Sequence, residues 1–161
     1  MIKVEEIVEK YKGYEVDEEK LKEFLVPPKP KTIWDLKIKD DYWCISDYDG
    51  NVRSTWDNCT IDNYRRSTGN CFLTEKEAKF EVERRKVEAI LLKYGGRRFK
   101  NSERNYYLYY DHEDNLIRKN MVDTCQSQGI IFFDDDKVID QAIKEAGEDN
   151  IKKYIFGVDA K

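Results

Sequence analysis

The segment 106–110, Tyr-Tyr-Leu-Tyr-Tyr, carries the side chains of this chain that are best suited to binding another molecule. On an extended strand, successive side chains point to opposite faces, so Tyr107 and Tyr109 share one face and the other three residues share the opposite one. One of these faces should line a core. The other can bury contact area against a protein or stack on unpaired bases.

Several arginines lie near this segment in the sequence, and they indicate that its free face belongs to a binding surface. Positive charge beside a contact surface steers a partner of complementary charge toward it. The residues that we predict to bind a partner are Arg84, Arg85, Arg97, Arg98, Arg104, Tyr107 and Tyr109.

Charge is spread unevenly along the chain. Its 161 residues carry a formal net charge of −4, which argues against non-specific binding of DNA or RNA by the whole surface. Residues 84–104 are nevertheless basic, and the region after residue 111 is acidic. Basic and acidic parts on one molecule suit a shaped partner better than a bare polyanion.

No set of residues in the sequence is typical of catalysis or of metal binding. The one histidine, His112, lies in a predicted turn without a neighbouring nucleophile. Cys44, Cys59, Cys71 and Cys125 are widely spaced, without the paired spacing of a zinc site. We expect four reduced thiols, with Cys44 and Cys71 packed as small apolar side chains. The prediction is a protein that is not an enzyme and has no cofactor and no metal.

The sequence also lacks the features of a membrane or secreted protein. No apolar run is long enough to span a bilayer, and the N-terminus has no signal-peptide core. An apolar content of 40% is enough to form a folded core. We therefore expect a cytoplasmic protein.

Residues 1–31 are predicted to form a small helical arm. Residues 3–12 have apolar side chains at helical spacing, and a second helix is expected to begin at Asp17. The segment Val26–Pro30 then predicts an extended, semi-rigid linker. We expect the arm to dock on the main body, where it could cover one face of the tyrosine strand; the alternative is a mobile arm that grips a partner.

The main body is predicted to contain two copies of one unit, in residues 32–98 and 99–161. Each unit has a β-hairpin, a short strand and a helix. The expected elements of the first copy are the segments 42–46, 51–56, 71–73 and 75–94, with residues 57–68 as a polar excursion. Thr74 is the expected N-cap of the first helix and Asp134 that of the second.

An internal alignment supports this duplication. Matching Tyr42 with Tyr106 also matches Trp43 with Tyr107, and a shorter second loop brings Phe72 into line with Phe132. One unit alone would expose its sheet, so the two should pack together. The predicted fold class is α+β, with tandem β-hairpin–strand–helix units behind an N-terminal helical arm.

Several motifs of the chain resemble small accessory proteins encoded by phages and prophages of Gram-positive bacteria. The motifs, spread over nearly the whole chain, are Trp34-Asp35-Leu36, Tyr42-Trp43-Cys44-Ile45, Asp49-Gly50-Asn51-Val52, Gly69-Asn70-Cys71-Phe72-Leu73-Thr74 and the ending Ala142–Tyr154. The resemblance implies a protein that acts in the cytoplasm of an infected host cell. It further implies a non-catalytic antagonist of host defence, such as an anti-CRISPR protein, that binds and inhibits a host protein or ribonucleoprotein.

A second resemblance gives the alternative function. The spacing of Phe72, Thr74 and Ala78 is similar to that in plant-type and phage-integrase DNA-binding units, in which a three-stranded sheet precedes a helix. Those units read DNA with arginine and tryptophan on the sheet face. The resemblance implies a nucleic-acid-binding module, sequence- or structure-selective, and its binding residues would be Arg53, Trp56, Arg65 and Arg66.

Overall fold

The structure is a computed structural model that describes residues 4–15, 32–48 and 50–158. The chain divides into two compact units, Met1–Lys31 and Thr32–Lys161. In the first, helix α1 (Val4–Lys10) is followed by a turn. The predicted second helix of the arm and its proline-rich linker lie outside the described residues. Docking of the arm stays a prediction.

The first sheet of the larger unit is a hairpin that is extended by a short third segment. Strands β1 (Asp41–Ser46) and β2 (Gly50–Thr55) pair antiparallel. On the other side of β1, Phe72 pairs antiparallel with Trp43, with two N···O distances of 2.8 and 2.9 Å. The side chain of Asn70 continues this pairing, because it accepts from the Ile45 amide and donates to the Ile45 carbonyl.

The second sheet repeats this arrangement. Its strands are β3 (Asn105–Asp111), β4 (Leu116–Val122) and β5 (Phe132–Phe133), in the order β4-β3-β5 with antiparallel neighbours. Tyr107 pairs with Phe132, which are the residues that the alignment matches with Trp43 and Phe72. In both sheets the first hairpin strand is therefore central, and the third strand lies on its free side.

Helices follow both third strands. Helix α4 (Glu75–Lys93) begins with the predicted cap, since Thr74 Oγ1 accepts from the Glu77 amide at 3.2 Å and the Glu77 carboxylate accepts from the Thr74 amide. Helix α5 (Asp136–Ala146) is capped by Asp135, so the prediction of Asp134 was wrong by one residue. The carboxylate of Asp134 is instead paired with Arg97. Helix α6 (Glu148–Tyr154) follows directly.

We predicted a polar excursion for residues 57–68, but this segment contains helix α3 (Thr60–Ser67). The side of α3 that faces the core carries Asp62 and Arg65 in place of apolar residues. Asp62 is 3% exposed and accepts a hydrogen bond from the Tyr42 hydroxyl at 2.7 Å. Arg65 donates to the same hydroxyl at 2.9 Å. Because the inward side is polar, no apolar periodicity marks this helix in the sequence.

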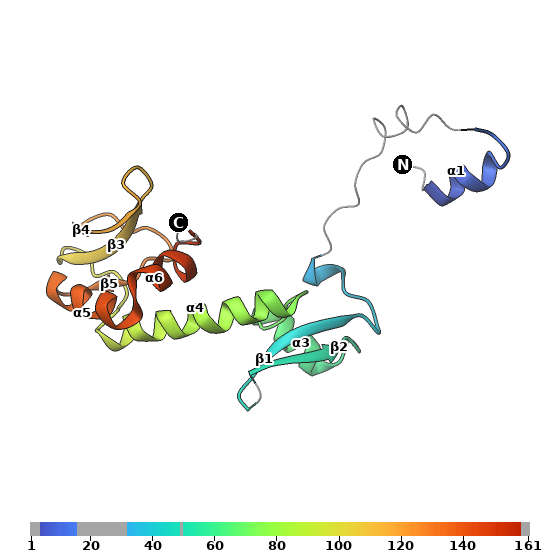
Figure 1. Cartoon of the computed structure of the whole chain (residues 1–161). Helices are drawn as coiled ribbons and strands as arrows, with labels where there is room; N and C mark the ends of the chain where they lie inside the picture. The colour runs from blue at the N-terminus through green and yellow to red at the C-terminus, as the bar shows by residue number, and fades with distance from the viewer. Residues whose placement is uncertain (1–3, 16–31, 49, 159–161) are drawn as a thin grey trace. The chain divides into compact units, whose positions relative to one another are not determined.

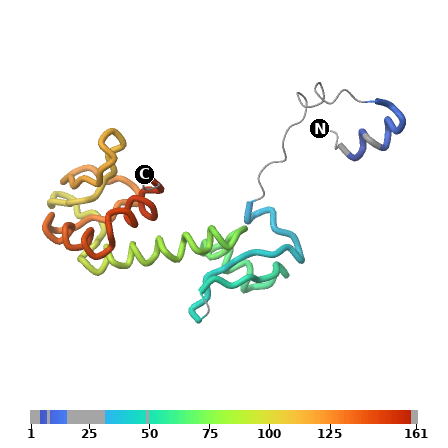
Figure 2. The backbone as a smooth tube through the Cα atoms, in the orientation of Figure 1, coloured from blue at the N-terminus to red at the C-terminus, as the bar shows by residue number. Residues whose placement is uncertain are grey.

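The fold is α+β, with two hydrophobic cores. The core at the first sheet consists of Leu36, Tyr42, Cys44, Trp56 and Cys71. The core at the second sheet consists of Val87, Leu91, Phe133, Ile139, Ala142, Ala146 and Ile151. Helix α4 contacts β1 and β2 as well as α5 and α6, and it can be followed between the two sheets in Figures 1 and 2. This shared helix contacts elements of both predicted units, and residues 32–161 form one compact unit.

The buried carboxylate Asp62 gives a prediction about pH. Burial opposes its ionisation, but hydrogen bonds from the Tyr42 hydroxyl and the Asp57 amide outweigh burial and lower the pKa of Asp62. Because the pKa of Asp62 is lower in the folded state than in the unfolded state, its ionised form stabilises the protein at pH values above the ordinary aspartate pKa. This stabilisation is lost as the pH falls below about 4. The free energy of unfolding should therefore drop between pH 5 and pH 3, and less so in Asp62→Asn.

Urea titrations followed by tryptophan fluorescence measure this effect, because all three tryptophans lie at positions 34, 43 and 56. Asp47→Asn is the matched control, since Asp47 is exposed in the β1–β2 turn. Equal pH dependence in the wild type and Asp62→Asn would show that this carboxylate does not couple stability to pH.

Candidate functional site

The tyrosine strand β3 presents its two faces as the alternation of its residues predicts. Tyr106 and Leu108 pack against the second core. The register of β3 and β4 then places Tyr109 beside Arg118, and Tyr107 beside Asn120, on the opposite face of the sheet. We call Tyr107, Tyr109, Arg118 and Asn120 the tyrosine face. Both tyrosines are half-buried, so part of each ring is open to solvent.

One ring of the tyrosine face, that of Tyr107, packs against a pair of phenylalanine side chains, Phe132 and Phe99. The Tyr107 ring packs edge-on against Phe132 with 5.9 Å between centroids, and the Phe99 ring also packs against Phe132 at 5.5 Å. Phe132 itself is 1% exposed. This packing restrains Tyr107 and, through a ring contact of 6.4 Å, Tyr109. A restrained aromatic surface loses little conformational entropy when a partner binds to it.

The hydroxyl groups of the two tyrosines differ in their hydrogen bonding. Tyr107 Oη accepts from Asn120 Nδ2 at 3.3 Å. Within the described residues we find no hydrogen bond from the Tyr109 hydroxyl. Beside it, Arg118 is paired with Asp111 and Asp114, so its charge is balanced inside the β3–β4 hairpin. Tyr109 therefore offers a polar group that a partner can use.

Arg97, one of the predicted partner-binding residues, is occupied inside the protein. Its guanidinium donates to the Asp134 carboxylate at 2.5 Å and to the side-chain oxygen of Asn105 at 2.8 Å. Two further bonds go to the carbonyls of Arg98 and Arg104. The side chain is only 14% exposed. Arg97 thus holds the segment before β3 in place and does not face solvent as the sequence pattern suggested.

The other predicted arginines divide into two pairs. Arg84 is paired with Glu81 at 2.7 Å and Glu88 at 3.1 Å, and Arg85 with Glu81 at 2.8 Å, so the charges of both are balanced along α4. Arg98 and Arg104 are exposed, and neither forms an ion pair with any described residue. In the sequence, Arg98 comes directly before Phe99, and Arg104 comes directly before β3. Of the five predicted arginines, these two keep an unbalanced charge.

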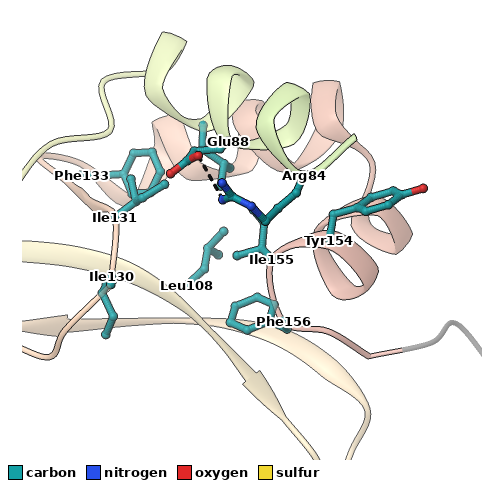
Figure 3. Close-up of a pocket in the computed structure, with 11 residues that line it drawn as sticks. Arg84, Glu88, Leu108, Ile130, Ile131, Phe133, Tyr154, Ile155 and Phe156 are labelled. Carbon is teal, nitrogen blue, oxygen red and sulfur yellow. Dashed lines mark hydrogen bonds and ion pairs between the residues drawn. The ribbon is translucent and has the colours of Figure 1, made fainter. Parts of the chain in front are cut away.

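A pocket of about 200 Å³ lies on the core side of the second sheet, and the sequence analysis did not identify it. Figure 3 shows Leu108, Ile130, Ile131 and Phe156 around it, with the Arg84–Glu88 ion pair at its side. These walls come from β3, the 129–131 loop and the end of α6, which are far apart in the sequence. Because the arginine and the glutamate bind each other, the pocket is an apolar hollow without a free charged group.

The alternative set of residues, for nucleic acid, is placed differently from the prediction. Trp56 is 2% exposed and belongs to the first core. Arg65 and Arg66 lie on α3 and not on the sheet, because the segment that we took as a polar excursion is helical. Arg53 is on β2, where it is exposed and paired with Asp41.

Arg66 is held by stacking. Its guanidinium lies 4.4 Å from the ring centroid of Trp56 and 5.1 Å from that of Trp34, and it also donates to Asn63 at 2.9 Å. Cation–π contacts of this kind stabilise the position of an arginine. Arg65 and Arg66 are thus bound to residues of the first sheet and its core, which leaves Arg53 as the only exposed arginine of this set.

No protein-family model, curated protein or solved structure matches the chain.

Among residues 4–15, 32–48 and 50–158, no group of three or more histidine, cysteine, aspartate or glutamate side chains is arranged to hold a metal ion. The described helices include none with the length and apolar character to cross a membrane. His112 is exposed, and its ring packs against Tyr110 at 4.8 Å.

The two neighbouring arginines 97 and 98 should differ sharply in their effect on stability. Arg97→Ala removes the guanidinium's hydrogen bonds to the Asn105 oxygen and to two carbonyls and leaves the Asp134 carboxylate without its arginine, so the free energy of unfolding should fall by about 2–3 kcal/mol. Arg98→Ala changes an exposed side chain, and a change within about 0.5 kcal/mol is expected. Urea unfolding followed by far-UV circular dichroism measures both variants. Similar losses in the two would contradict the placement of Arg97 in the interior.

Proposed function

We propose that this protein is a non-catalytic binding protein and that the tyrosine face is its contact surface. The observation that supports the proposal most is the position of Tyr107 and Tyr109. They lie on the sheet face opposite the second core, are restrained by Phe132 and remain partly exposed. Tyrosine and arginine are enriched among the residues that dominate binding energy at protein interfaces.

The partner that we propose is a host protein or ribonucleoprotein. The resemblance to small phage and prophage proteins supports this choice, and with it a role as an antagonist of host defence, anti-CRISPR-like, in the cytoplasm of the infected cell. The surface fits a protein partner because its aromatic rings are restrained and because few arginines near it in the sequence, Arg98 and Arg104, lack an ion pair with a described residue. Binding of a phosphate backbone would call for many such cations.

Nucleic acid is less well supported as the direct partner. Three of the four residues of the alternative set are engaged inside the protein: Trp56 belongs to the first core, Arg65 bonds to Tyr42, and Arg66 stacks on Trp56. A net charge of −4 adds to this argument. No separate observation favours the nucleic-acid function.

The first test is a pull-down of the tagged full-length chain from host lysate, with and without nuclease, read by mass spectrometry. We expect a stoichiometric host protein that survives nuclease treatment. Its affinity should fall at least about tenfold for the double variant Tyr107→Ala/Tyr109→Ala, since truncation of a central interface tyrosine costs about 2 kcal/mol. Tyr64→Ala is the matched control, because Tyr64 is 68% exposed on α3.

Two outcomes would overturn the proposal. Equal affinity of the wild type and the double tyrosine variant would remove the tyrosine face as the contact surface. Recovery of only nuclease-sensitive material would replace the protein partner with nucleic acid.

Arg98 and Arg104 should affect the rate at which the partner is captured. The double reversal Arg98→Glu/Arg104→Glu is expected to slow association by about tenfold at low salt and to weaken its salt dependence, while dissociation changes little. Surface plasmon resonance at several salt concentrations measures both rates. Lys76→Glu/Lys144→Glu makes the same change in net charge at exposed positions of α4 and α5 and is the control. An unchanged association rate would exclude steering by these arginines.

A further inference from the structure

The register of the first sheet places Cys44 opposite Cys71. Trp43 and Phe72 exchange both of their backbone hydrogen bonds, Trp43 N to Phe72 O and Phe72 N to Trp43 O. In an antiparallel pairing, the next pair of residues along is then not hydrogen-bonded, and its Cα atoms lie about 4.5 Å apart. That next pair is Cys44 and Cys71. Disulfides form between residues whose Cα atoms are about 4.4–6.8 Å apart.

Both thiols point to the same side of the sheet. Cys44 is 0% exposed and Cys71 is 3% exposed, and they belong to one core together with Tyr42 and Trp56. Trp43 and Phe72, their neighbours in sequence, are on the opposite side by alternation. Two sulfurs on facing strands, directed into one core, are therefore next to each other.

The second sheet, which has the same arrangement, shows which residues can pack at the position of Cys44 and Cys71. In the second sheet, Tyr107 and Phe132 form the equivalent pair, so the residues that correspond to the two cysteines are Leu108 and Ile131. These are aliphatic and line the apolar pocket. Packing at this position is thus satisfied by residues without a reactive group, whereas the first sheet has a thiol on both strands.

We propose that Cys44 and Cys71 are a redox-sensitive pair, which a peroxide converts to a cross-strand disulfide. One thiolate attacks hydrogen peroxide, which gives a sulfenic acid and hydroxide. The second sulfur then attacks the sulfenic sulfur, the S–S bond forms and the sulfenic oxygen leaves as water. In total, the two thiols lose two protons and two electrons, and the peroxide is reduced to two molecules of water.

The disulfide joins a weakly held segment to the hairpin. The third strand is attached to β1 by the two Trp43–Phe72 bonds and by the Asn70 side chain. It leads directly into α4, which contacts β1 and β2 as well as α5 and α6. A covalent bond at residue 71 therefore anchors the start of the helix that connects the two sheets.

The reaction should be slow at neutral pH and faster in alkaline solution. Burial raises the pKa of the Cys71 thiol to about 11, so little of the reactive thiolate is present at pH 7. Cys59 and Cys125 are exposed and would react in competition. They are best removed before the buried pair is tested.

The test uses the full chain with Cys59→Ser/Cys125→Ser, oxidised with hydrogen peroxide at pH 7 and pH 9. Remaining thiols are blocked with N-ethylmaleimide in denaturant, and the protein is digested with trypsin. The two cysteines fall in separate tryptic peptides, residues 40–53 and 67–76, so a linked peptide identifies the bond by mass. We expect this linked peptide, formed faster at pH 9, and a Tm higher by about 5–10 °C that returns to its original value with dithiothreitol.

Two comparisons make the test decisive. Oxidation of the same variant in urea shows how much linkage arises without the fold, and we expect a lower yield there than in the native protein. Adding Cys44→Ala should abolish both the linked peptide and the rise in Tm. Thiols that stay reduced, sulfinic acid at either cysteine in place of a linkage, or a linkage that forms only in urea would each overturn the proposal.

Discussion

The pairing of a short third strand with the first strand of each hairpin is the constraint on which the larger unit depends. In the first sheet this pairing consists of one residue pair, Trp43 with Phe72, and in the second of the pairs made by Phe132 and Phe133. A helix begins within three residues of each third strand. The pairing therefore determines where α4 and α5 start, and strand alternation then decides which residues enter a core.

Polar residues complete the interior where the apolar cores end. Asp62 and Asn105 are both buried, and each is surrounded by hydrogen bonds that hold a neighbouring loop. The side chain of Asn105 bonds to backbone atoms of Lys100, Glu103 and Val122, and it also accepts from the Arg97 guanidinium. Buried polar groups need such partners, since an unsatisfied group would cost the protein stability. Two arginines take part in these networks: Arg97 donates to Asn105, and Arg65 donates to the Tyr42 hydroxyl that also binds Asp62.

This use of arginine explains why the two sheets suggest different roles. In the first sheet, Arg65 and Arg66 hold α3 against Tyr42 and Trp56, so the residues that resemble a DNA-reading set have structural contacts. In the second sheet, Arg97 takes the internal position, and Arg98 and Arg104, which precede β3 in the sequence, remain exposed. The second sheet thus combines two partly exposed tyrosines with two arginines, nearby in the sequence, that form no ion pair with a described residue.

Features that depend on local interactions could be predicted from the order of the residues. The hairpins, the Thr74 cap and the matching of Trp43–Phe72 with Tyr107–Phe132 follow from strand alternation and helix-capping chemistry, which act over a few residues. The separation of Tyr107 and Tyr109 from the core residues of β3 was predictable for the same reason.

Features that depend on contacts between distant residues could not be predicted in this way. Helix α3 was missed because the side that faces the core is polar and is stabilised by Tyr42, which lies in another strand. Arg97 and Arg98 are adjacent and chemically identical, and only the positions of Asn105 and Asp134 select the first for the interior. Because Asp134 is paired with Arg97, the N-cap of α5 is Asp135. A local pattern cannot distinguish such neighbours, since their environments come from segments that meet only when the chain folds.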